Sequence, residues 1–185
     1  MRKVKAVTKP RLIRNLALIG FMGTGKSTIG HIVADELKFR LLDTDHLIES
    51  RTGKTISQIF ADNGEQAFRE LERDVINEIA SVEKTVIACG GGLATNQKNL
   101  DSLKTHALVV CLWLSPEKIW ERVRHQSHRP LLQDKNPLEK IRALLAAREP
   151  FYRQADVLVN TEIRSTKEVA QHVLHEFHLA HPAQR

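Results

Sequence analysis

The stretch GFMGTGKSTIG, residues 20–30, decides the fold. Gly20, Gly25, Lys26 and Ser27 match the pattern G-x-x-x-x-G-K-[ST] of a phosphate-binding loop. In such a loop, glycines let backbone N–H groups converge on phosphate oxygens, the lysine ammonium reaches the terminal phosphates, and the serine hydroxyl can bind magnesium. The stretch therefore predicts a loop that holds a nucleotide by its phosphates; a glycine-rich turn without a ligand is the alternative.

Both flanks of this loop support the prediction. Residues 16–20 have the pattern of a buried strand, and residues 27–37 have that of a helix with apolar residues on one face. The positive end of the helix dipole would add to the attraction for phosphate. The residues that we expect to contact the nucleotide here are Gly23, Thr24, Gly25, Lys26, Ser27 and Thr28.

Short apolar runs alternate with longer helical patterns along the rest of the chain. Runs that are apolar throughout are typical of parallel strands, because helices cover both faces of such a sheet. We therefore expect a three-layer α/β fold around a five-stranded parallel sheet. The expected strands are residues 16–20, 39–45, 85–89, 107–114 and 155–160. The expected helices are residues 27–37, 65–82, 97–104, 116–124, 137–149 and 166–178.

Two stretches interrupt this alternation. Residues 46–64 follow the second expected strand, and residues 124–137 are polar and basic. Long inserts in a compact fold are usually binding segments or lids, so we expect each of these two stretches to have one of these roles. Residues 15–180 are expected to form a single domain between an amino-terminal tail (1–14) and a carboxyl-terminal tail (181–185).

The net charge of +6 comes from the amino-terminal end of the chain. Residues 1–14 hold six Lys and Arg residues and no Asp or Glu, and the 22 basic residues after them match the 22 acidic ones. The tail is either a functional arm or a solvated terminus. A second basic run, residues 122–135, lacks the interleaved aromatic side chains on which single strands stack. We therefore expect no nucleic-acid partner.

The longest apolar run, residues 107–114, is too short to cross a bilayer. The run at 16–20 leads into a glycine-rich loop, which argues against a secretory signal peptide. Cys89 and Cys111 lie in apolar runs, which indicates buried thiols in a reducing compartment. We expect a soluble, cytoplasmic protein with no membrane partner; a basic, acid-free start also fits an organelle-import sequence.

The segment LLDTD places Asp43 and Asp45 at the end of the second expected strand. In an extended segment, side chains two residues apart face the same side, so both carboxylates are expected to face the crevice where open α/β sheets bind ligands. There Asp43 would help to hold magnesium, and Asp45 would accept a hydrogen bond from the acceptor hydroxyl. The alternative is a pair of acids that cap the next helix.

Three consecutive glycines follow the third expected strand, in the segment CGGGLAT (89–95). An ordinary turn does not need three glycines, and each one carries an entropic cost in the folded state. A close approach of the backbone to a ligand would explain them, and a plain flexible loop is the alternative.

Two arginines lie on long expected helices. Arg69 has Glu65 and Glu72 at helical spacing, and Arg148 has Glu149 beside it. Taken alone, the spacing favours a solvent-exposed ion pair for each arginine rather than a ligand contact.

The ordered segments GFMGTGKS, LLDTD, GEQAFRELE, CGGGLAT, HRPLL and AAREPFY together resemble the shikimate kinase family, over residues 15–161. The resemblance implies a P-loop kinase fold similar to that of nucleoside monophosphate kinases, with a substrate-binding insert at 46–64 and a mobile lid at 124–137. It also implies transfer of the γ-phosphate of ATP to the 3-hydroxyl of shikimate, which gives shikimate 3-phosphate and ADP on the route to chorismate and the aromatic amino acids. One magnesium ion and a monomeric protein are expected.

The resemblance further implies roles for single residues of this sequence. The catalytic set is Lys26, Asp45 and Arg129, of which Arg129 is the lid arginine that meets the phosphates. Arg122 and Arg129 join the loop residues on the nucleotide side. The magnesium set is Ser27 and Asp43. The shikimate-binding set is Asp45, Arg69, Gly91, Gly92 and Arg148.

Two rival functions share the phosphate-binding loop. A kinase for another small polyol or acid, such as gluconate, would not be expected to combine the aspartate pair, the three glycines and both arginines. A nucleic-acid-binding P-loop protein would use the basic tail and the 122–135 run. A GTPase is disfavoured because the sequence has no Asn-Lys-x-Asp motif for reading guanine.

Overall fold

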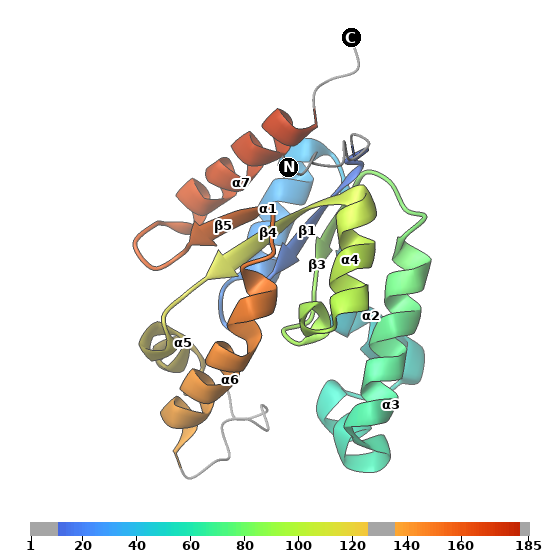
Figure 1. Cartoon of the computed structure of the whole chain (residues 1–185), viewed down its shortest axis with the longest axis vertical. Helices are drawn as coiled ribbons and strands as arrows, with labels where there is room; N and C mark the ends of the chain where they lie inside the picture. The colour runs from blue at the N-terminus through green and yellow to red at the C-terminus, as the bar shows by residue number, and fades with distance from the viewer. Residues whose placement is uncertain (1–10, 126–135, 182–185) are drawn as a thin grey trace, which may run out of the picture.

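The computed structural model describes residues 11–125 and 136–181. At its centre, five parallel strands form one sheet in the order β2-β3-β1-β4-β5 (Figure 1). The strands are β1 (Asn15–Ile19), β2 (Arg40–Asp43), β3 (Thr85–Ala88), β4 (Ala107–Trp113) and β5 (Val157–Asn160). The five-stranded parallel sheet expected from the apolar runs is confirmed.

Helices cover both faces of this sheet, as expected (Figure 1). They are α1 (Lys26–Leu37), α2 (Thr44–Thr52), α3 (Ile56–Ile79), α4 (Gln97–His106), α5 (Pro116–Val123), α6 (Pro137–Tyr152) and α7 (Thr166–Ala180), with a short 3-10 helix at Leu93–Thr95. Alternate residues of β1 point to opposite faces of the sheet. Leu16 and Leu18 pack in the core under α1 and α7, whereas Ala17 and Ile19 pack in the core under α2 to α6.

The insert expected at 46–64 consists of helix rather than an irregular segment. It contains most of α2 and the first part of α3. Gly64 interrupts α3 with φ 80° and ψ 173°, a conformation that side-chain-bearing residues rarely adopt. The expected helix at 65–82 is therefore the second half of α3, and it begins where this break ends.

The loops that form the site all follow the carboxyl ends of strands. The phosphate-binding loop follows β1, Asp43 ends β2, and the glycines at 90–92 come directly after the buried Cys89 that follows β3. Because these strands are parallel neighbours in the order β2-β3-β1, the three segments meet at one edge of the sheet. The sheet therefore places the expected donor and acceptor segments side by side.

Two further expectations concern the compartment. Cys89 and Cys111 are both buried free thiols, as predicted, and burial raises the pKa of Cys111 to about 12. Over residues 11–125 and 136–181, no helix has the length and apolar character needed to cross a membrane.

Candidate active site

The phosphate-binding loop has the geometry that its glycines predict. Gly23 and Gly25 have φ angles of 77° and 96°, and Gly25 leads directly into α1 at Lys26. The Lys26 ammonium donates hydrogen bonds to the carbonyl oxygens of Gly20 (3.0 Å) and Phe21 (2.9 Å). The lysine is thus folded back over its own loop, with the positive end of α1 beside it, and this arrangement suits an anion.

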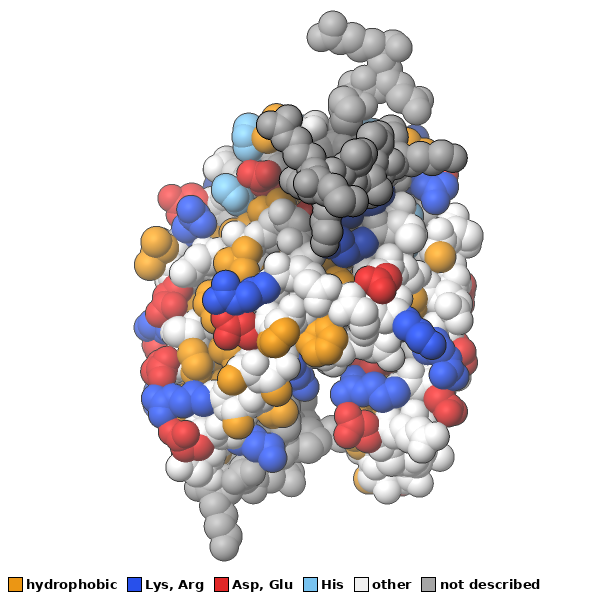
Figure 2. Space-filling view, in the orientation of Figure 1, with side chains coloured by type: hydrophobic (Ala, Val, Ile, Leu, Met, Phe, Trp, Pro, Cys, Tyr) orange, Lys and Arg blue, Asp and Glu red, His pale blue; other side chains and the backbone are white. Residues whose placement is uncertain are grey.

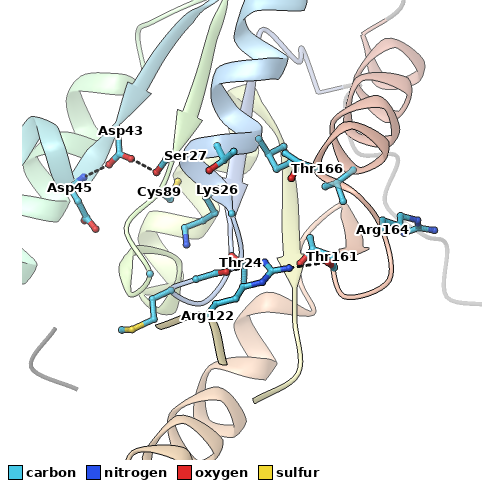
Figure 3. A pocket seen from close by; sticks show the side chains of 17 residues that line it. Thr24, Lys26, Ser27, Asp43, Asp45, Cys89, Arg122, Thr161, Arg164 and Thr166 are labelled. Atoms are coloured by element: carbon cyan, nitrogen blue, oxygen red, sulfur yellow. Dashed lines mark hydrogen bonds between the residues drawn. The ribbon is translucent and has the colours of Figure 1, made fainter. Parts of the chain in front are cut away.

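A cavity of about 440 Å³ opens above this loop (Figure 3). Its floor is formed by residues 22–29, and Lys26 lies between an acidic side and a basic side. The acidic side includes Asp43 and Asp45. In the space-filling view the molecule is notched at its lower edge, between the part formed by α3 and the part formed by α5 and α6 (Figure 2).

Asp43 both caps a helix and contacts the phosphate-binding loop. One carboxylate oxygen accepts from the backbone N–H groups of Asp45 (3.1 Å) and His46 (3.3 Å), which caps α2. The other accepts from the Ser27 hydroxyl at 2.8 Å. A hydroxyl and a carboxylate are the oxygen ligands that Mg²⁺ prefers, and it usually takes only one or two from the protein. The pair therefore fits a magnesium ion.

The expectation that Asp45 lies on an extended segment is wrong. The chain is not extended there, because α2 begins at Thr44 and Asp45 lies in its first turn. Asp45 nevertheless lines the cavity, because the first turn of α2 lies at the carboxyl end of β2. A carboxylate at a helix amino terminus is also stabilised by the helix dipole.

Two of the three glycines make room for charged side chains. A Cβ atom on Gly90 would lie 2.1 Å from Oδ1 of Asp45, and one on Gly92 would lie 2.6 Å from Nη1 of Arg69. Both distances are shorter than any contact that a real Cβ atom makes. Without a Cβ atom, Gly90 and Gly92 leave room for the ends of Asp45 and Arg69 beside the backbone, and a Cβ atom at either position would displace the end of that side chain.

The third glycine is held by α6. The carbonyl oxygen of Gly91 accepts hydrogen bonds from Nη1 of Arg148 (3.1 Å) and from the buried Tyr152 hydroxyl (2.9 Å). The Arg148 guanidinium also lies over the Phe21 ring, 5.0 Å from its centroid. The solvent-exposed pair expected with Glu149 is wrong, because Glu149 pairs with Arg153 instead. Arg148 thus faces the 90–92 loop.

Arg69 pairs with both predicted neighbours, but one of these pairs is not solvent-exposed. Its Nη2 and Nε contact Oε1 of Glu65 at 2.8 and 3.3 Å, and its Nη1 contacts Oε2 of Glu72 at 2.7 Å. Only 1% of the Glu72 side chain is exposed. Burial raises the pKa of Glu72, and the charges of Arg69 and Arg148 oppose that rise. The carboxylate of Asp45 adds to the rise, so these four groups form one electrostatic cluster.

The opposite side of the cavity contains residues that the sequence did not indicate. Arg122, which was expected there, donates to the carbonyl oxygens of Gly23 (3.1 Å) and Thr161 (3.3 Å). The unexpected lining residues are Thr161, Arg164, Thr166 and Val169, from the end of β5 and the start of α7. Their position after the carboxyl end of a parallel strand was the available signal. Arg129, and with it most of the expected lid at 124–137, lies outside the described residues.

Comparisons with known proteins agree with this geometry. The family model described as "Shikimate kinase" matches residues 22–178. A curated shikimate kinase from Thermodesulfovibrio yellowstonii is 42% identical over 165 residues, which is 89% of this chain and 95% of the relative. The solved structure of shikimate kinase from Acinetobacter baumannii in complex with shikimate has a TM-score of 0.86 and 39% sequence identity, and the match covers 93% of this chain and 96% of that one.

A rival suggested by the sequence also appears among the structural neighbours. A gluconokinase from Sinorhizobium meliloti 1021 has a TM-score of 0.59 over 92% of this chain and 95% of its own, with 18% sequence identity. At that identity the likeness concerns the fold alone. The gluconokinase therefore shares the architecture around the phosphate-binding loop without supporting gluconate as an acceptor.

Proposed function

The chain belongs to the shikimate kinase family, which transfers the γ-phosphate of ATP to the 3-hydroxyl of shikimate, and we propose that this transfer takes place between the phosphate-binding loop and the 90–92 loop. One observation carries the proposal. Asp45 from α2, Arg69 from α3 and Arg148 from α6 all approach the 90–92 loop, which shares the cavity edge with the phosphate-binding loop.

We assign the carboxylate of shikimate to the two arginines. Arg69 and Arg148 come from different helices and reach the same short loop, at Gly92 and at Gly91. Guanidinium groups form forked contacts with a carboxylate, and such charge-assisted hydrogen bonds are about twice as strong as neutral ones. The absence of a side chain at Gly91 would let the ring lie against the backbone, next to the Arg69 guanidinium that occupies the space beside Gly92.

Asp45 is assigned to the hydroxyl groups of shikimate. It lines the cavity beside the phosphate-binding loop, so a hydroxyl bound to it would lie close to the terminal phosphate. The carboxylate would orient the attacking 3-hydroxyl as a hydrogen-bond acceptor and would receive its proton. Its negative charge also balances part of the positive charge of the two arginines, which suits a substrate with one carboxylate and three hydroxyls.

The nucleotide phosphates are assigned to the loop after β1. Phosphoryl transfer depends mostly on alignment and on neutralisation of charge. Lys26 and the backbone N–H groups of the loop would bind the phosphates, and Ser27 with Asp43 would hold Mg²⁺. When bound there, the ion would supply positive charge to the phosphate oxygens. Arg122 and the β5–α7 residues would contact the base end of the nucleotide.

An acceptor panel tests this function. ADP release is measured in a coupled assay with ATP, Mg²⁺ and one of three additions: shikimate, gluconate or buffer alone. The expected result is rapid ADP release with shikimate and a background rate in the other two reactions. Equal rates with gluconate would reject the acceptor assignment, and equal rates with buffer alone would reject kinase function in favour of ATP hydrolysis.

A further inference from the structure

Arg69 uses two different edges of its guanidinium for its two carboxylate partners. The edge formed by Nε and Nη2 contacts Glu65, and Nη1 contacts Glu72. A guanidinium binds an incoming carboxylate most strongly through two N–H groups on one edge. In this structure, the Nε/Nη2 edge of Arg69 is already satisfied by a carboxylate of the chain itself.

The two glutamates hold Arg69 with very different firmness. Glu72 lies three residues later on the same helical segment, and its side chain is 1% exposed. Glu65 is 67% exposed, and it directly follows Gly64, where α3 is interrupted. Moving Glu72 away from Arg69 would leave a buried carboxylate without its charged partner, whereas Glu65 can turn into solvent with little loss of free energy. Glu72 is therefore suited to orient Arg69, and Glu65 is suited to leave it.

We propose that Glu65 competes with the carboxylate of shikimate for Arg69, so that the substrate binds only by displacing it. This inference rests on the proposed function, in which Arg69 binds that carboxylate. Glu65 then acts as a built-in substitute ligand: it keeps the guanidinium paired and aligned beside Gly92 until an acid of the right shape replaces it.

Competition by Glu65 would weaken shikimate binding, and this sets the direction in which a Glu65 variant should change the affinity. Exposed ion pairs contribute little, so Glu65 lowers the affinity for shikimate by a small factor rather than blocking the site. Removing its charge should therefore tighten binding. A residue whose task was to position Arg69 would have the opposite effect, because its loss would weaken binding. The sign of the change in KM separates the two roles.

The test compares Glu65→Gln with Glu70→Gln, an exposed glutamate on the same helix that lines a separate cavity next to α2. Both variants lose one negative charge, but only the first alters the partner of Arg69. We expect the KM for shikimate to fall about two- to fivefold in Glu65→Gln, as suits the loss of an exposed ion pair. The KM for ATP should stay unchanged in both variants, and the KM for shikimate should stay unchanged in Glu70→Gln.

A neutral analogue shows whether the competition concerns the carboxylate. The methyl ester of shikimate cannot form the charged fork, so its binding, measured by calorimetry, should not improve in Glu65→Gln. An unchanged or raised KM for shikimate in Glu65→Gln would overturn the proposal, and so would an equal gain for ester and acid.

An Arg69→Lys variant distinguishes a failure of this proposal from a failure of the proposed function on which it rests. If Arg69→Lys binds shikimate as tightly as the wild type does, the assignment of Arg69 in the proposed function fails. If Arg69→Lys binds weakly but Glu65→Gln shows no gain, only the competition fails.

Discussion

Arg148 and Gly91 lie 57 residues apart in the sequence, yet the guanidinium Nη1 of Arg148 donates to the carbonyl oxygen of Gly91 at 3.1 Å. The same carbonyl accepts the Tyr152 hydroxyl, and the guanidinium lies over the ring of Phe21. Two hydrogen bonds from α6, one from Arg148 and one from Tyr152, thus hold the loop after β3.

Arg148→Lys should weaken shikimate binding. An ammonium cannot hold the Gly91 carbonyl and fork a carboxylate at once, and a hydrogen bond to a charged group contributes about 1.5–3 kcal/mol. We expect the KM for shikimate to rise roughly tenfold or more, with the KM for ATP unchanged. Arg153→Lys, at the C-cap of the same helix and paired with Glu149, is the control. Wild-type affinity for shikimate in Arg148→Lys would remove this arginine from the site.

Asp45→Asn should slow turnover without loss of ATP binding. The amide keeps the size of the side chain but cannot receive the proton of the attacking hydroxyl, and such proton transfer contributes about 10²- to 10⁴-fold. We expect kcat to fall at least about a hundredfold, with ATP affinity unchanged in calorimetry. A variant with wild-type kcat would show that Asp45 has no part in the chemical step.

Alanine at two of the three glycines should have two different effects. Gly90→Ala would push the carboxylate of Asp45 aside, so kcat should fall, whereas Gly92→Ala would push the guanidinium of Arg69, so the KM for shikimate should rise. Both contacts involve the ends of flexible side chains, so thermal unfolding temperatures should change little. Kinetics for both variants at saturating ATP measure the split; the same effect from both would contradict it.

Asp43→Asn should raise the Mg²⁺ concentration that activity requires. Asn caps helices about as well as Asp, so α2 should remain intact, but the carboxylate that faces Ser27 is lost. We expect the Mg²⁺ concentration for half-maximal activity to rise several-fold, with stability near that of the wild type. Glu168→Gln, in the capping box of α7, is a remote control. Superimposable magnesium titrations for Asp43→Asn and the wild type would exclude Asp43 as a ligand.

His106 should make the protein less stable in mild acid. Burial and the nearby charge of Arg14 lower the pKa of His106, and its Nδ1 accepts a hydrogen bond from Asn15 at 2.9 Å. The unfolded chain therefore binds more protons between the folded pKa and the ordinary value near 6.5, so the free energy of unfolding falls as the pH drops through that window.

Urea unfolding at pH 7.5, 6.0 and 5.0 measures this effect. The midpoint of wild-type unfolding should fall more steeply with acid than that of His106→Gln. His175→Gln, at an exposed position of α7, should follow the wild type. Equal slopes for all three proteins would mean that protonation of His106 does not contribute.

The sheet was predictable because its strands are short apolar runs. These runs appear in the sequence without reference to the rest of the molecule, and each expected strand corresponds to one in the structure. The phosphate-binding loop was predictable for a similar reason, since its glycines and Lys26 form one local pattern. Local patterns of this kind need no knowledge of tertiary contacts.

Other features depend on packing and could not be predicted in that way. Asp45 was placed on an extended segment, but Asp43 caps a helix that begins one residue later. The burial of Glu72 follows from the way α3 packs, because spacing alone shows only that Glu72 can reach Arg69. The hydrogen bond from Arg148 to the Gly91 carbonyl depends on how α6 packs against the loop after β3, whereas the sequence offered the adjacent Glu149 as the simpler partner.

The register between β1 and β3 sets the spacing between the phosphate-binding loop and the 90–92 loop. Leu18 pairs with Ala88, and the N–H of Cys89 donates to the Leu18 carbonyl at 3.0 Å, directly before both loops begin. A slip of one residue would move one loop past the other by about 3.3 Å, more than in-line attack tolerates. The backbone hydrogen bonds of these two central strands therefore fix the distance between the two loops, independently of the side chains that the surface helices carry.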